Sequence, residues 1–160
     1  MNSLLSKINH VLEKLLMLMM LAIVVTVSWQ VFSRFILGSP SSYTEELSRY
    51  LLIWIGVLGA AYAYKTKAHL GLDLFVEKLP AELKHYALVL IEILVLLFAT
   101  LVMVYGGLSL MILTLELKQT SAALGLQMGW VYSVIPLSGM LITLFAALNI
   151  RTILTNKESI

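Results

Sequence analysis

The sequence predicts an all-α integral membrane protein with four tilted transmembrane helices and a cytoplasmic amphipathic segment before the third helix. Composition is the first observation behind this prediction. Of 160 residues, 60% are hydrophobic and 12% are charged, and the mean hydropathy is +0.94, whereas a soluble domain carries about 25% charged residues. The second observation is that charges are absent from four long runs, at residues 15–33, 50–64, 93–115 and 119–150. Because the pieces between the runs are too short to fold in water on their own, we expect residues 1–160 to form a single membrane domain.

The first predicted span covers about residues 15–33, close to the roughly 20 apolar residues that cross a bilayer core. A cleaved signal peptide is not expected, because its hydrophobic region has about 7 to 15 residues, whereas this run has 19. Trp29 and Arg34 stand near the end of the run. Aromatic and basic side chains are favoured where a helix leaves the membrane, so we expect both to be interfacial anchors.

The second predicted span covers about residues 46–66, although its charge-free run has only 15 residues. Arg49 and Lys65 flank that run, and their long side chains can reach the two interfaces. Ser42 and Glu45 have the spacing of a capping box, in which the hydroxyl and the carboxylate satisfy free amides at a helix start. Glu45 and Arg49 also have the i, i+4 spacing of a helical ion pair. We therefore expect this helix to begin just after Ser42, outside the charge-free run.

The third predicted span covers about residues 92–115. Pro80 is favoured at the first position of a helix, and a helix that starts there would exceed the membrane thickness. We therefore expect its first turns to lie along the cytoplasmic surface as an amphipathic segment. The fourth run contains several glycines and a proline, so we expect an irregular stretch around 120–127 and a span at about 129–150. Trp130 stands at the start of that span and is a further expected interfacial anchor.

Basic residues are distributed unequally between the two sides that four spans would create. The side with both termini carries eight, and the other side carries three. The eight are Lys7, Lys14, Lys65, Lys67, Lys78, Lys84, Arg151 and Lys157, and the three are Arg34, Arg49 and Lys118. Since basic residues favour the cytoplasmic side, the pattern predicts that both termini are cytoplasmic.

Small residues recur along the second predicted span, at Gly56, Gly59, Ala60 and Ala63. Helices in lipid associate by close packing, so small residues at this spacing indicate a contact face. The face could pack inside this chain or against another chain, and the sequence leaves both alternatives open. Trp54 lies on the same helix and is expected to be either an anchor at an interface or a ring that faces lipid.

Glu92 is the one acidic residue with long apolar stretches on both sides. An ionisable group within a membrane segment suggests a function by default. We favour an interfacial anchor, because the 23 charge-free residues that follow can span the membrane without it. A contact to a partner and a proton or ion relay are the alternatives.

The chain shows no set of residues that could carry enzyme chemistry. It has no cysteine, which excludes disulfides, thiol chemistry and Cys-bound clusters. His10, His69 and His85 fall outside the predicted spans, which argues against the haem ligands of a respiratory-enzyme anchor subunit. A net charge of +2 is too small to indicate nucleic-acid binding. We expect no enzyme activity, cofactor or metal, and an autonomous four-helix channel or carrier and the respiratory anchor remain the alternatives to a membrane component whose chemistry lies elsewhere.

Short motifs are spread over most of the chain. They are Arg34-Phe35-Ile36-Leu37-Gly38, Glu45-Glu46-Leu47-Ser48-Arg49-Tyr50, Trp54 with Gly59-Ala60-Ala61, His69 with Asp73, Leu79-Pro80, Leu124-Gly125-Leu126, Trp130 and Pro136-Leu137. Together they resemble the small membrane subunit of tripartite ATP-independent periplasmic (TRAP) transporters, the DctQ-like family. Two positions depart from that family: Tyr43 stands where tryptophan is frequent, and Gly71 stands where a basic residue is common.

The resemblance implies a scaffold subunit of a sodium-coupled secondary transporter in the bacterial inner membrane. In such a system a periplasmic binding protein delivers an organic acid, such as sialic acid or a C4-dicarboxylate. A large membrane subunit moves the acid, and the small subunit supports the large one in the lipid bilayer. The resemblance also makes Glu45, Glu46 and Arg49 candidate contacts for the large subunit or the binding protein. With Trp54 and the four small residues of the second span, they form the expected partner interface.

Overall fold

The computed structural model describes residues 2–66 and 80–156, and His69 and Asp73 lie outside this part of the chain. The helical elements are α1 (Asn2–Phe35), α2 (Ser42–Lys65), α4 (Ala81–Phe98), the π-helix η1 (Ala99–Gly106), α5 (Gly107–Glu116), α6 (Met128–Tyr132) and α7 (Val134–Asn156). In the described ranges there is no β-strand, only an isolated bridge between Thr120 and Gln127.

Four helical stretches are long and apolar enough to cross a membrane: Ser6–Phe35, Ser42–Lys65, Leu83–Glu116 and Met128–Thr155. The prediction of an all-α fold with four such helices is confirmed. Three of the stretches extend at both ends beyond the span that we expected from the charge pattern, and Ser42–Lys65 begins four residues earlier than expected but ends one residue before the expected end at 66. Helical hydrogen bonds form in water as well as in lipid, so the charged residues that end an apolar run do not end the helix.

The third long helix is continuous through α4, η1 and α5. Phe98 and Gly107, which flank η1, keep right-handed helical angles, with φ of −60° and −65°. Pro80 directly precedes the first residue of α4 and caps it with an extended backbone, at φ −54° and ψ 147°. The helix therefore runs over residues 81–116 without a break, in a local π-helical form at its middle.

The fourth long helix is divided at Ser133 into α6 and α7. A proline ring clashes with the carbonyl of the residue four positions earlier. For Pro136 that residue is Tyr132, where α6 ends. Residues 120–127 before α6 form turns and no helix, which confirms the irregular stretch that we predicted there.

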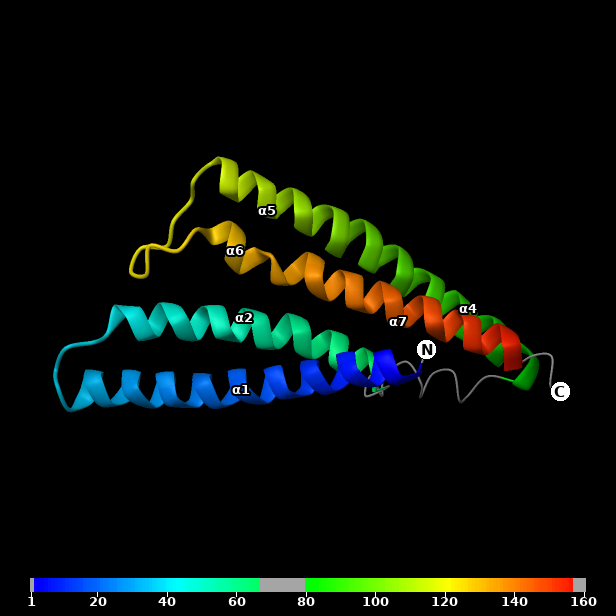
Figure 1. Ribbon diagram of the computed structural model, residues 1–160, viewed down its shortest axis with the longest axis horizontal. Helices are drawn as coiled ribbons and strands as arrows, with labels where there is room; N and C mark the ends of the chain where they lie inside the picture. The colour runs from blue at the N-terminus through cyan, green and yellow to red at the C-terminus, as the bar shows by residue number, and fades with distance from the viewer. Residues whose placement is uncertain (1, 67–79, 157–160) are drawn as a thin grey trace.

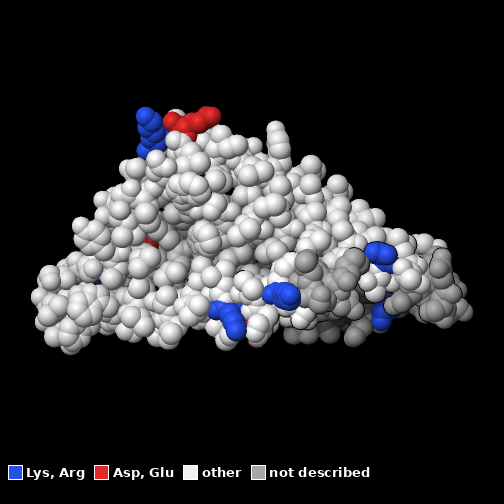
Figure 2. Space-filling view, in the orientation of Figure 1, with Lys and Arg blue, Asp and Glu red and all other residues white. Residues whose placement is uncertain are grey.

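The long helices lie side by side in the order α1, α2, α7 and the α4–α5 helix (Figure 1). The stretch Met128–Thr155, which contains α6 and most of α7, is the most enclosed of the four: 44% of an apolar 18-residue window in it is buried, against 0% for Ser6–Phe35 in α1. The first residues of α1 and the last residues of α7 lie toward the same end of the bundle (Figure 1). On the face in Figure 2, uncharged atoms predominate and the few charged atoms lie near its margins.

Two glycines set close contacts between α7 and the third long helix. A methyl group added at Gly107 would lie 2.9 Å from the Cδ atom of Pro136. One added at Gly139 would lie 2.7 Å from the Cβ atom of Met103. Neither distance leaves room for a methyl group, so both positions require glycine. From the sequence, Gly139 was one of the glycines that interrupt the fourth apolar run, and its close contact with another helix was not predicted.

Two small clusters of buried residues form the core. One contains Leu12, Leu58 and Val134, and the other contains Ala61, Ala99 and Ile142. Both include a residue of α2 and a residue of α7, so these clusters fix which side of α2 faces inward. The opposite side of α2 is therefore turned away from the bundle.

A candidate partner interface on helix α2

The small residues of α2 lie on its outward side. We call Gly56, Gly59, Ala60 and Ala63 the outer face of α2. Leu58 and Ala61 point inward, with 1% and 0% of their surface exposed. Gly56 and Ala60 are exposed, whereas Gly59 and Ala63 are partly covered. A Cβ atom added at Gly56 or Gly59 would meet no heavy atom within 4 Å.

This geometry bears on the two alternatives for the outer face. In the part of the chain that the structure describes, nothing packs against the α-carbons of Gly56 and Gly59. The glycines that do make internal contacts, such as Gly107 and Gly139, are crowded by their neighbours. Close packing through small residues is how helices associate in lipid. The described residues therefore leave the outer face uncovered, and its contact with another chain stays a prediction.

Two hydrogen bonds on the inner side of α2 fix its rotation about its axis. The Trp54 indole N–H donates to the Val131 carbonyl oxygen at 3.1 Å. The hydroxyl of Ser138, which is fully buried, donates to the Val57 carbonyl oxygen at 2.7 Å. Trp54 was expected to touch a partner or lipid, and the structure gives its indole a partner on α6. These bonds hold the outer face outward.

The Glu46 carboxylate anchors the irregular segment between α5 and α6 to the start of α2. One oxygen accepts hydrogen bonds from the backbone N–H groups of Ala123 at 2.9 Å and Leu124 at 2.7 Å. The other accepts from the Ala122 N–H at 3.1 Å and from the Tyr50 hydroxyl at 2.7 Å. Since charge-assisted bonds of this kind are strong, Glu46 has a structural role. Its contact with a partner stays a prediction.

Replacing Glu46 by alanine should loosen this segment. The amides of residues 122–124 lose their acceptor, so their hydrogen exchange should become faster and the free energy of unfolding should fall by about 1–3 kcal/mol. Glu45→Ala is the matched control, because it removes only an exposed ion pair worth about 0–1 kcal/mol. Unchanged exchange at 122–124 in the Glu46 variant would show that the carboxylate does not hold the segment.

An exposed cluster of Arg34, Glu45 and Arg49 joins α1 to α2. Glu45 accepts a hydrogen bond from Arg49, which confirms the predicted ion pair, and lies 4.0 Å from Arg34 Nη2. The predicted capping box is wrong. Ser41 rather than Ser42 caps α2, and it does so without a side-chain hydrogen bond. The Glu45 carboxylate pairs with the two arginines instead of with a backbone amide. Exposed ion pairs contribute little to stability. The two arginines, with 52% and 70% of their side chains exposed, give this cluster of three residues a net charge of +1.

Glu92 ties together α2, α4 and α7. One carboxylate oxygen accepts a hydrogen bond from the Tyr64 hydroxyl, and the other accepts from Asn149 Nδ2 at 3.0 Å. The residue is partly buried. The structure gives this side chain partners inside the bundle, and its role as an interfacial anchor stays a prediction. Because each carboxylate oxygen accepts a hydrogen bond, the side chain is held in one position and links α4 to α2 and α7.

Of the other expected interfacial anchors, Trp29 and Arg34 lie in the last two turns of α1 and Trp130 lies in α6. Trp29 and Trp130 expose 51% and 63% of their surface. The Trp29 ring stacks on Phe32 with a centroid distance of 5.7 Å. Exposure of this degree permits contact with lipid headgroups, and the anchoring role of both residues stays a prediction.

Within residues 2–66 and 80–156, no group of three or more His, Cys, Asp and Glu side chains could hold a metal ion. His10 is exposed at the start of α1, and His85 lies edge-on against Tyr86. The described residues therefore offer hydrogen-bonded anchors and an open helix face, which suit contacts between helices.

Comparisons with known proteins agree on one kind of protein. Residues 23–156 match the family described as "Tripartite ATP-independent periplasmic transporters, DctQ component". The sialic acid TRAP transporter small permease protein SiaQ of Vibrio cholerae is 31% identical over 99 residues, which cover 62% of this chain and 57% of that protein. A putative TRAP transporter small permease protein of Haemophilus influenzae is 32% identical over 130 residues, covering 79% and 77%.

A third relative is much longer. The isethionate TRAP transporter permease protein DctMQ of Oleidesulfovibrio alaskensis is 29% identical over 125 residues, which cover 74% of this chain but only 20% of that protein. The chain thus matches little more than half of the SiaQ relative and a fifth of DctMQ. These relatives are named as components of transporters and not as enzymes.

Proposed function

Because this chain, a multi-pass membrane protein, belongs to the DctQ component family of tripartite ATP-independent periplasmic transporters, we propose that it is the scaffold subunit of such a transporter. In this role it supports a large membrane subunit that moves the substrate. The outer face of α2 is the observation that carries the proposal. It presents glycine and alanine to the outside of a chain whose internal glycine contacts are crowded.

The long relative supports a large membrane partner. In the DctMQ permease, about four fifths of the protein lie outside the segment that matches this chain. A scaffold of this kind needs helices that are fixed relative to one another and a surface that binds the partner. The hydrogen bonds of Glu46 and Glu92 fix the helices. The outer face of α2 and the Arg34–Glu45–Arg49 cluster are the surfaces that would bind the partner.

The remaining parts of the proposal concern the transport system. The relatives are named for sialic acid and isethionate, which supports an organic acid as substrate, delivered by a periplasmic binding protein and driven by sodium. The excess of basic residues beside both termini supports a bacterial inner-membrane protein with cytoplasmic ends. In this orientation the Arg34–Glu45–Arg49 cluster faces the periplasm, where it can contact the binding protein.

Purification of the tagged chain from its own membranes in mild detergent tests the proposal. We expect a large, very hydrophobic membrane protein to copurify with it, and uptake of an organic acid into liposomes to need both subunits and the binding protein. Uptake by liposomes that contain this chain alone would contradict the scaffold role and would favour an autonomous carrier.

A further inference from the structure

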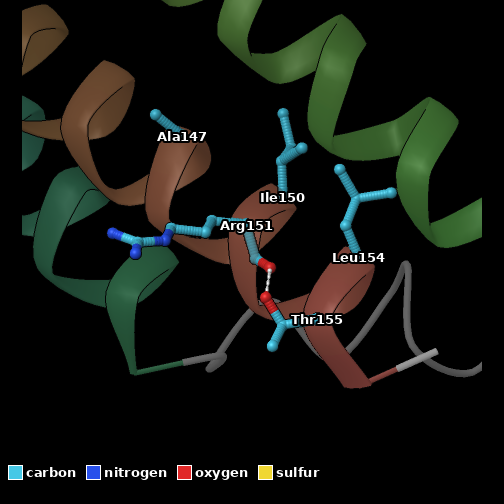
Figure 3. Close-up of a pocket in the computed structure, with 5 residues that line it drawn as sticks. All are labelled: Ala147, Ile150, Arg151, Leu154 and Thr155. Carbon is cyan, nitrogen blue, oxygen red and sulfur yellow. Dashed lines mark hydrogen bonds between the residues drawn. The ribbon is translucent and has the colours of Figure 1, made fainter. Parts of the chain in front are cut away.

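A pocket lies beside the last turns of α7. Its volume is about 370 Å³. Its walls in the described part of the chain are Ala147, Ile150, Arg151, Leu154 and Thr155. In Figure 3, Ile150 and Leu154 point toward α4, whereas Arg151 extends toward the end of α2. The pocket thus has an aliphatic side and a cationic side.

Arg151 is an uncompensated positive charge. Its side chain is exposed and makes no hydrogen bond or ion pair with the residues that the structure describes. Glu92, whose carboxylate is held by Asn149 two positions before Arg151, already accepts one hydrogen bond on each oxygen. The end of α2, toward which Arg151 extends, finishes in Lys65. Among the described residues, no acidic side chain pairs with Arg151 or Lys65.

The pocket also lies at one end of a candidate membrane span. The candidate span Met128–Thr155 has 28 residues, about 42 Å at 1.5 Å per residue. A bilayer measures about 40–45 Å with its headgroups included. Arg151 stands one turn before the end of this candidate span, and a span of this length would bring its guanidinium to the level of the phosphate groups. Leu154, which is 52% exposed, offers an aliphatic surface at the same corner.

We propose that this pocket binds the headgroup of an anionic phospholipid. The Arg151 guanidinium holds the phosphate, because its planar set of N–H donors suits a bidentate contact with phosphate oxygens. Ile150 and Leu154 face the first carbons of an acyl chain. Basic pockets beside transmembrane helices on the cytoplasmic side favour anionic lipids over zwitterionic ones, which gives the site its selectivity.

Lipid titration of the purified full chain in detergent tests this site, with binding measured by native mass spectrometry and by the shift in melting temperature. Dioleoylphosphatidylglycerol should bind more tightly than dioleoylphosphatidylcholine, and Arg151→Gln should weaken its binding about fivefold. Lys14→Gln is the matched control, since it removes an exposed cation from the same end of the bundle and should leave binding unchanged. Arg151→Lys should lie between the wild type and Arg151→Gln, because it keeps the charge and loses the bidentate contact.

Three results would overturn the assignment. Equal binding of phosphatidylglycerol by Arg151→Gln and the wild type would show that Arg151 does not hold the lipid. Displacement of the lipid by inorganic phosphate at equal concentration would indicate a plain anion site. Loss of the copurified large subunit from Arg151→Gln, with lipid binding intact, would assign the pocket to a protein contact.

Discussion

Replacing Gly59 by leucine should leave the isolated subunit folded and remove the large membrane subunit from its purified complex. The added side chain meets no atom of the described chain within 4 Å at its Cβ position, so the bundle has room for it. On the outer face of α2, however, it would hold a facing helix away from the backbone. Overpacking of a helix contact costs about 1–3 kcal/mol, which corresponds to roughly 5- to 150-fold weaker association.

The measurement compares the amount of large subunit recovered with the tagged chain and the melting temperature of the chain alone. Gly106→Leu is the matched control, because Gly106 is an exposed glycine of another long helix. It should leave the recovered complex unchanged. Equal recovery from the Gly59 variant and the wild type would place the partner contact elsewhere on the molecule, and equal loss from both variants would show that the effect is not specific to α2.

The sequence predicted the long helices well because their main determinant is local. Apolar runs, and the glycines and proline of the fourth run, lie within a few residues of the features that they specify. Pro136 is an example, since its ring acts on the carbonyl of Tyr132, only four positions earlier. The π-helical form of η1 (Ala99–Gly106) has no such local signal, because its residues are those of an ordinary apolar helix.

The anchors of the candidate site could not be predicted in the same way. Glu46 bonds to amides that lie 76 to 78 residues away in the chain, and no spacing rule connects such positions. Glu92 was singled out as an isolated acid, but its partners Tyr64 and Asn149 were not. A signal existed for both partners: each is a polar residue in an otherwise apolar run, and such a residue needs a hydrogen-bond partner in lipid. Which partner it finds depends on how the helices are placed.

The sequence also does not tell which glycines face a neighbouring helix. Gly106 and Gly107 are adjacent in the sequence, but only one of them is crowded by another helix. A methyl group at Gly106 would lie 3.8 Å from the Leu101 carbonyl oxygen, which is an ordinary van der Waals contact. At Gly107 it would lie 2.9 Å from both the Ile135 side chain and the Pro136 ring. Neighbouring positions on a helix point about 100° apart, so one faces outward and the other faces α7.

Gly107→Leu should therefore lower the stability of the isolated subunit strongly, whereas Gly106→Leu should not. The Pro136 ring is rigid and belongs to the central helix, so it cannot yield as a flexible side chain would. We expect a loss of about 3 kcal/mol or more in the free energy of unfolding for the Gly107 variant. For the Gly106 variant we expect little change or a small gain, since leucine favours a helix more than glycine does by roughly 1 kcal/mol.

Unfolding in denaturing detergent, followed by the fluorescence of the three tryptophans, one of which is Trp54 with its contact to α6, measures both changes. The two variants differ in position by one residue and carry the same added side chain, so hydrophobicity and helix propensity cancel in the comparison. Equal stability of the two would mean that α7 does not pack on the third long helix through Gly107. A drop confined to Gly107→Leu would establish that this crossing, and not the apolar composition shared by both positions, holds the scaffold together.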